Sequence, residues 1–79
     1  MEAKVTTLNN SRRYGEIKKR GAEIVRSLLS EGYLLVSQSN ACETVTLKHS
    51  VNGNRMFIKC GYFGVWVYKN GKLVKVEMI

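Results

Sequence analysis

Residues 11–32 read SRRYGEIKKRGAEIVRSLLSEG, and the spacing of their apolar side chains predicts an amphipathic helix. Apolar or small residues recur at steps of three and four, which places them on one face of a helix. These residues are Tyr14, Ile17, Gly21, Ile24 and Leu28. Charged and polar residues fill most of the positions between them. Such a helix needs an apolar surface to lie against, and the rest of the chain predicts a sheet that supplies one.

The two ends of this helix carry capping signals, and its middle carries a glycine. Asn10 or Ser11 can accept a hydrogen bond from the first turn, and Gly32 can adopt the left-handed conformation that ends a helix. Gly21 costs about 1 kcal/mol relative to alanine inside a helix, so we expect close packing of the helix backbone on the sheet there. We expect residues 1–10 to form a flexible tail or an edge strand.

Turn signals divide the chain after the helix into short strands. Residues 33–39 and 43–50 have the composition and alternation of strands. Two Asn-Gly pairs predict tight hairpins, because both central residues of the favoured turn need positive φ. These pairs are Asn52-Gly53 and Asn70-Gly71. The stretch 61–64, GYFG, supplies a further turn.

Closing these turns sets a register in which apolar residues meet apolar residues on one face of the sheet. The expected pairs are Val51 with Asn54, His49 with Met56, Leu47 with Ile58, Val45 with Cys60, Ile58 with Val67, Cys60 with Val65, Val67 with Val74 and Val65 with Val76. The predicted buried face is Val45, Leu47, Met56, Ile58, Cys60, Val65, Val67, Val74 and Val76. The chain therefore predicts an α+β fold of one domain, residues 1–79. In it, one N-terminal amphipathic helix packs on an antiparallel β-meander of four to five strands.

The same register predicts an unusual composition for the other face of the sheet. Its expected members are Thr46, Lys48, Arg55, Phe57, Lys59, Trp66, Tyr68, Leu73 and Lys75. Three readings compete for this mixture of rings and cations. Single-stranded nucleic acid can stack its bases on the rings while the cations neutralise phosphates. A protein partner can cover the patch, or the rings can pack across strands for structural reasons alone.

A basic cluster lies at the start of the predicted helix, and a solvated helix face is the favoured explanation of the cluster as a whole. Within it, Arg12 and Arg13 are the further candidates for contact with a partner, because they lie next to the chain end. The predicted binding residues are Lys48, Arg55, Phe57, Lys59, Trp66, Tyr68, Lys75, Arg12 and Arg13.

The charge balance favours a polyanionic partner. Thirteen Lys and Arg residues stand against six acids, which gives a net charge of +7. All six acids are glutamates, and the absence of aspartate weakens a nuclease or kinase reading, since aspartate commonly holds Mg²⁺ in such sites. A basic surface that merely keeps a small domain soluble is the plainer alternative.

No residue pattern indicates an enzyme, a cofactor or a metal site. His49 is the only histidine and has no acid or cysteine at ligand spacing. Cys42 and Cys60 are expected on opposite faces of the sheet, which is incompatible with a disulfide, so two reduced thiols are expected. The chain lacks an apolar run of the roughly 20 residues that a membrane helix needs, and a signal-peptide pattern. These absences lead us to expect a cytoplasmic protein without a membrane partner.

The sequence therefore predicts a non-enzymatic binding module that contacts DNA or RNA, single-stranded by preference. The alternative is a protein-interaction module, such as a small inhibitor or accessory factor of a phage-type mobile genetic element. For any weak homodimer, we expect contact through a sheet edge. The aromatic face would set Lys48, Lys59 and Lys75 against their own copies, and unpaired charges inside an interface are costly.

Overall fold

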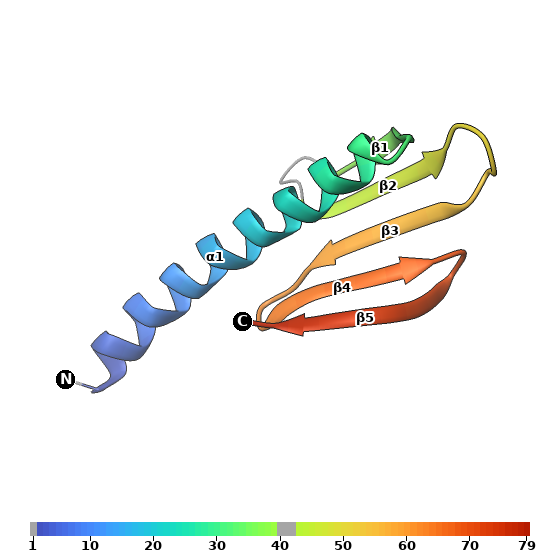
Figure 1. Ribbon diagram of the computed structural model, residues 1–79. Helices are drawn as coiled ribbons and strands as arrows, with labels where there is room; N and C mark the ends of the chain where they lie inside the picture. Colours follow the sequence, from blue (N-terminus) through green and yellow to red (C-terminus); the bar gives the residue numbers. More distant parts are fainter. Residues whose placement is uncertain (1, 40–42) are drawn as a thin grey trace.

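The computed structural model describes residues 2–39 and 43–79, with side chains described from Arg13 onward. One helix, α1 (Glu2–Ser30), precedes five strands: β1 (Tyr33–Gln38), β2 (Thr44–His49), β3 (Arg55–Cys60), β4 (Gly64–Lys69) and β5 (Lys72–Met78). The strands form one antiparallel sheet in the order of the chain, and α1 covers one of its faces (Figure 1). This arrangement confirms the predicted α+β meander.

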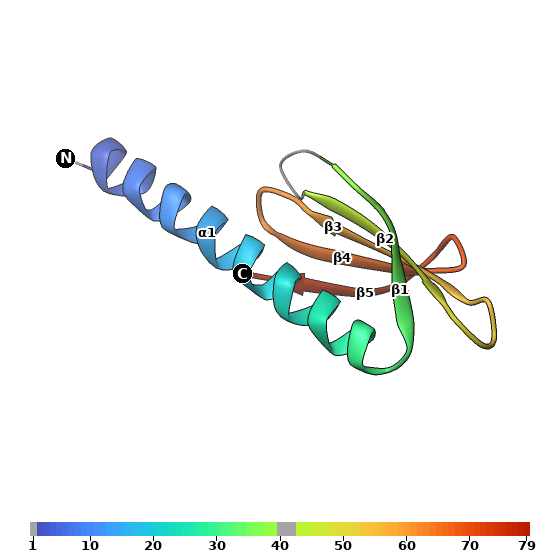
Figure 2. The ribbon, with the colours of Figure 1, turned by 90° about the horizontal axis from the view of Figure 1, so that it is seen from above.

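The helix is longer than the apolar pattern predicts. It begins at Glu2 rather than at Ser11, so residues 2–10, for which a tail or an edge strand was expected, have helical backbone. Asn10 and Ser11 lie inside the helix rather than at its start. Each residue added to an existing helix contributes one backbone hydrogen bond. A helix can therefore continue through a residue type that is also able to cap a helix start. Figures 1 and 2 show the N-terminal part of α1 running past the end of the sheet.

The C-terminal end of α1 is the predicted glycine cap. Gly32 has a φ of 99°, and its N–H donates to the Leu29 carbonyl at 3.2 Å. The chain then turns directly into β1, whose first residue, Tyr33, belongs to the core. The core lies between α1 and the sheet. Its buried members are Ile17, Tyr33, Val45, Leu47, Met56, Ile58, Cys60, Val65 and Val67.

The β2–β3 hairpin is shifted by two residues from the predicted register. Val45 pairs with Ile58 and Leu47 with Met56. The cause is a loop of four residues, 50–53, instead of a two-residue turn: of its residues only Gly53 has positive φ, at 76°. A shift of two residues leaves every side chain on its original face. The predicted core residues of β2 and β3 are therefore buried as expected.

The imidazole of His49 organises this longer loop. Its Nδ1 accepts from the backbone N–H groups of Val51 and Asn52, at 3.1 and 3.3 Å. Its Nε2 lies 3.0 Å from the Glu31 carbonyl at the end of α1. Because Nδ1 accepts two donors, the proton sits on Nε2 and is donated to that carbonyl. His49 is a structural link between the hairpin and the helix.

The β4–β5 hairpin corrects one prediction about the core. Asn70 and Gly71 form the predicted turn, with φ of 52° and 84°. A bulge then shifts the register between Val67 and Tyr68, so Val67 pairs with Lys75 and Val65 pairs with Glu77. The two valines expected in the core, Val74 and Val76, are 56% and 40% exposed. The bulge turns Val76 to the face away from α1. The helix packs over β1, β3 and β4, so β5 lies at an edge of the sheet.

Candidate nucleic-acid interface

The face of the sheet turned away from α1, here called the outer face, carries three short rows of paired side chains. The rows run across the strands and are Leu34, Lys48 and Arg55; Ser37, Thr46, Phe57, Tyr68 and Leu73; and Thr44, Lys59, Trp66 and Val76. In the part of the chain that the structure describes, no helix lies over this face (Figure 2). The outer face is therefore open to a partner.

Three aromatic rings lie at the centre of the outer face. The Phe57 and Tyr68 rings have centroids 5.8 Å apart and are tilted by 59°. The Trp66 indole lies across Gly61, where a Cβ atom would stand 2.6 Å from its Cζ3. The absence of a side chain at Gly61 thus leaves the space that the indole occupies just beyond the end of β3. All three rings are partly buried, so each is held in place and still reaches the surface.

Positive charge flanks these rings on both sides. Lys48 and Arg55 lie beyond one side of the Phe57 row and Lys59 beyond the other, and all three cations are exposed. The five strands contain a single acid, Glu77. Glu77 pairs with the core residue Val65 and therefore points to the helix side. The strands contribute no carboxylate to the outer face.

Six of the predicted binding residues lie together on the outer face: Lys48, Arg55, Phe57, Lys59, Trp66 and Tyr68. Lys75 does not join them, because the bulge in β5 turns it to the helix side, where its Nζ lies 3.0 Å from Glu77 Oε2. Arg13 lies at the end of the sheet, with its guanidinium carbon 6.0 Å from the centre of the Phe63 ring. The side chain of Arg12 is outside the described residues.

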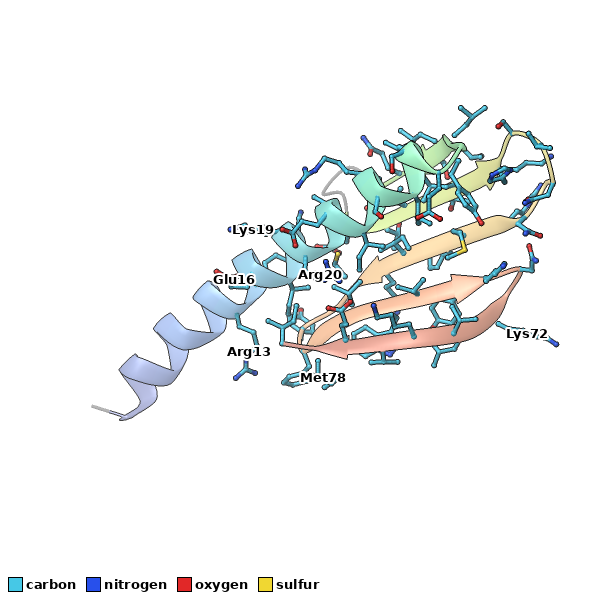
Figure 3. All side chains as sticks on the ribbon, in the orientation of Figure 1. Arg13, Glu16, Lys19, Arg20, Lys72 and Met78 are labelled. Carbon is cyan, nitrogen blue, oxygen red and sulfur yellow. The ribbon has the colours of Figure 1, made fainter. Side chains whose placement is uncertain are left out.

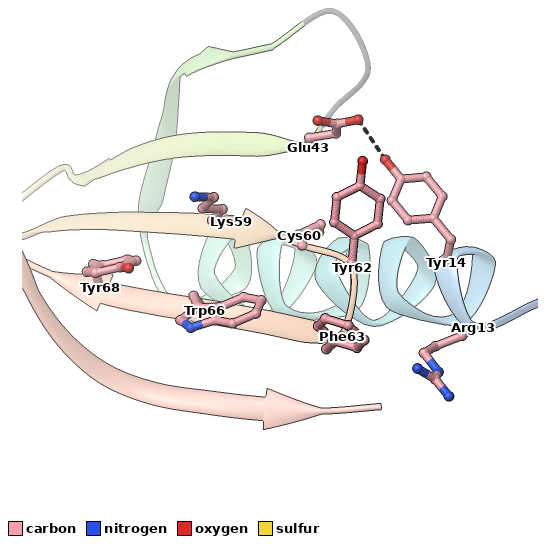
Figure 4. A pocket seen from close by; sticks show the side chains of 10 residues that line it. Arg13, Tyr14, Glu43, Lys59, Cys60, Tyr62, Phe63, Trp66 and Tyr68 are labelled. Atoms are coloured by element: carbon pink, nitrogen blue, oxygen red, sulfur yellow. Dashed lines mark hydrogen bonds between the residues drawn. The ribbon is translucent and has the colours of Figure 1, made fainter. Parts of the chain in front are cut away.

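A groove of about 980 Å³ continues the outer face around the end of the sheet (Figure 4). Its lining joins Lys59, Trp66 and Tyr68 of the outer face to Arg13, Tyr14, Glu43, Cys60, Gly61, Tyr62 and Phe63. Sequence reasoning missed four of these as site residues: Tyr14, Glu43, Tyr62 and Phe63. Tyr14 was assigned to the core face of the helix, and Glu43 was assigned to no site at all.

Tyr62 and Phe63 could have been found from the sequence. They are the two central residues of the β3–β4 turn, which the Gly61 N–H closes on the Gly64 carbonyl at 2.9 Å. Neither residue has positive φ, and loop residues are typically polar or small, so two neighbouring aromatic residues at a turn are a signal that the sequence itself carries. Their side chains are 83% and 56% exposed. Adjacent exposed rings at a loop tip are a sign of a binding surface.

Tyr14 and Glu43 join the helix to the beginning of β2. The Tyr14 hydroxyl donates to Glu43 Oε1 at 2.7 Å. This hydrogen bond, together with removal from water and the nearby negative charge of Glu43, raises the pKa of Tyr14 to about 12. The bond holds the Glu43 carboxylate at a defined place in the groove (Figure 4).

Arg20 and Glu77 form a second charged contact, on the helix side of the sheet. Figure 3 shows Arg20 on the part of α1 that lies beside the sheet. Arg20 donates to both carboxylate oxygens of Glu77, at 2.8 and 3.0 Å. This bidentate contact, with Lys75 as a second donor, lowers the pKa of Glu77 to about 2 and raises that of Arg20. The contact ties α1 to the edge strand β5 and takes no part in the outer face.

Cys60 is a buried packing residue. Its Sγ lies 3.9 Å from the Ile17 carbonyl, and burial raises the pKa of its thiol. The predicted separation of Cys42 from Cys60 concerns a residue outside the described ranges. Among the described residues, no three His, Cys, Asp or Glu side chains gather closely enough to hold a metal ion.

Within residues 2–39 and 43–79, no helix combines the length and the apolar character needed to cross a bilayer. Comparison with protein-family models, with curated proteins and with solved structures finds no match to this chain.

Proposed function

We propose that this protein binds single-stranded nucleic acid along its outer face. One observation carries the proposal: a cluster of partly buried aromatic rings, with cations around it, on a sheet face to which the strands contribute no carboxylate. An open face of an antiparallel sheet is ordinarily polar. Rings placed among cations match a ligand that has both flat apolar surfaces and negative charge.

The physics of the contact favours a single strand over a duplex. Bases of a single strand are free to stack on aromatic rings, and each stacked base is worth about 1–3 kcal/mol. Phe57, Trp66 and Tyr68 offer such rings, while Lys48, Arg55 and Lys59 can neutralise phosphates. In a duplex the base faces are already stacked on one another. The proposed role is binding alone, because these residues supply stacking surfaces and fixed charges.

The fluorescence of Trp66 provides a direct test, because Trp66 is the only tryptophan in the chain. We expect DNA or RNA oligomers of about ten nucleotides to quench it in a saturable way. With three phosphate contacts, the logarithm of the binding constant should fall with the logarithm of salt concentration at a slope of about −2. No quenching and no mobility shift at low salt would contradict the proposal.

Matched lysine variants separate a specific surface from general positive charge. Lys59→Ala should weaken binding of the oligomer and reduce the salt slope. Lys19→Ala removes the same charge from an exposed position of α1 and should leave both quantities close to the wild-type values. Equal losses in the two variants would mean that only the overall charge matters.

A protein partner is the second candidate, and it is favoured by the edge strand β1. Leu34, Leu35 and Val36 are consecutive apolar residues with 60%, 50% and 59% exposure. Among the described strands, β1 pairs with β2 alone and lies at an edge of the sheet, and an open strand edge can receive a strand from another protein. Purification from a lysate treated with nuclease distinguishes the two: a protein partner remains bound, whereas an association bridged by nucleic acid is lost.

A further inference from the structure

The groove at the end of the sheet contains one carboxylate in an otherwise basic and aromatic setting. Among the side chains that the structure describes, Glu43 is the only acid that lines it, whereas Arg13 and Lys59 contribute two cations. The carboxylate is oriented by the Tyr14 hydroxyl, which donates to Oε1 at 2.7 Å. One such bond leaves a carboxylate with further acceptor positions on both oxygens. A held acceptor of this kind repels phosphate and attracts N–H donors.

The remaining lining of the groove defines the shape of a suitable ligand. Tyr62, Phe63 and Trp66 present aromatic rings around it (Figure 4). The Arg13 guanidinium lies over the Phe63 ring at the end of the groove away from the outer face. Lys59 lies at the other end, where the groove joins the outer face. A ligand that satisfies all these groups has a flat apolar ring, an anionic group and N–H donors at the edge of the ring. A nucleotide has all three.

The four bases differ in the donors that they offer to a carboxylate. Guanine carries N1–H and N2–H side by side on its pairing edge, which matches the two oxygens of one carboxylate. Adenine and cytosine offer one amino group, next to a ring nitrogen that repels a carboxylate. Uracil and thymine offer one N–H between two carbonyl oxygens. Paired donors in this geometry give the strongest contact.

We propose that the groove receives one guanine of the bound strand, with the pairing edge of the base on the Glu43 carboxylate. This inference rests on the proposed function, since it assumes a strand on the outer face. The groove begins at Lys59, Trp66 and Tyr68, so a strand that follows the outer face reaches it without a break. The outer face then supplies affinity for any sequence, and Glu43 supplies a preference for one base.

Three oligomers of equal length test the preference. Each is a thymidine oligomer of about ten nucleotides with one central position occupied by guanine, by hypoxanthine or by adenine. Hypoxanthine is guanine without its 2-amino group, so it removes one of the two donors and little else. Wild-type protein, followed through Trp66 fluorescence, should bind the guanine oligomer about five- to a hundredfold more tightly than either of the others.

Glu43→Gln is the matched variant, because its side chain has the same shape and can still accept from Tyr14. It should lose the preference for guanine over hypoxanthine. It should bind the plain thymidine oligomer at least as tightly as the wild type, because one negative charge has gone. Equal binding of the three oligomers by the wild type would overturn the guanine site and leave the proposed function standing. Failure of every oligomer to bind would overturn the proposed function as well.

Discussion

Gly21 of α1 lies directly against the thiol of Cys60 in β3: a Cβ atom at Gly21 would stand 2.5 Å from Cys60 Sγ. Both residues are buried. A glycine inside a helix is unfavourable by itself, and this contact explains why the chain tolerates it. The helix backbone approaches the sheet at this point more closely than any side chain would allow.

Gly21→Ala should destabilise the protein despite the better helix propensity of alanine. Alanine gains up to about 1 kcal/mol in a helix, but crowding a packed core costs about 1–3 kcal/mol. The free energy of unfolding in urea should therefore fall by about 1 kcal/mol. Combining Gly21→Ala with Cys60→Ala makes room for the added methyl group, so the double variant should lose less than the two single losses together.

Gly15→Ala is the control for this prediction. Gly15 is exposed in the same helix, and a Cβ there would meet nothing within 4 Å. This substitution should raise the free energy of unfolding by up to about 1 kcal/mol. Equal effects of the two glycine substitutions would show that Gly21 is not packed against β3.

Glu77 should make the protein sensitive to acid. Its pKa is lowered from 4.5 to about 2 in the folded chain, chiefly by hydrogen bonds from Arg20 and then Lys75. A lowered pKa contributes stability above pH 4.5, and this contribution disappears as pH falls towards 2. The urea midpoint of the wild type should therefore drop through this window. Glu77→Gln and Arg20→Gln should each show a shallower drop, and a Glu77→Gln profile parallel to the wild type would contradict the ion pair.

The Tyr14 hydroxyl should lose its proton at a higher pH than the hydroxyl of a free tyrosine. Its pKa is raised from 10 to about 12, chiefly by the hydrogen bond to Glu43. The contact therefore stabilises the fold below pH 10, and this stabilisation is lost between pH 10 and 12. An absorbance titration of tyrosinate should show a late phase that Tyr14→Phe removes and Tyr62→Phe retains. Circular dichroism at each pH must show that the chain is folded. If the high-pH phase disappears in Tyr62→Phe, the phase belongs to Tyr62, and the prediction for Tyr14 is contradicted.

The outer face should stay open in the free protein. Self-pairing would bring Lys48, Arg55 and Lys59 against their own copies, with no acid from the strands to compensate them. Light scattering should give the same mass for wild type and Trp66→Ala.

If the wild type forms a dimer, Val36→Lys should disrupt it, since a charge on an open edge strand opposes edge pairing. A dimer that Trp66→Ala converts to a monomer would show that the outer face is the dimer interface.

Much of the fold follows from local patterns in the sequence. The apolar spacing of α1 predicted its buried face, and the turn at 70–71 has the predicted positive φ angles. The β3–β4 register was predicted correctly, with Ile58 opposite Val67. The turn at 52–53 was predicted with the wrong length, yet a shift of two residues changes no face. Six of the nine proposed binding residues lie together for that reason.

The sequence by itself determined the features that depend on the spacing of apolar residues and on the residues at the turns. These features are one amphipathic helix, a meander of strands and two distinct faces of the sheet. Only the tertiary structure decided the orientation of β5, because a one-residue bulge reverses every later side chain and has no local signal here. It also decided the groove. Tyr14 and Glu43 are 29 residues apart in the chain, and they meet only because α1 crosses the end of the sheet.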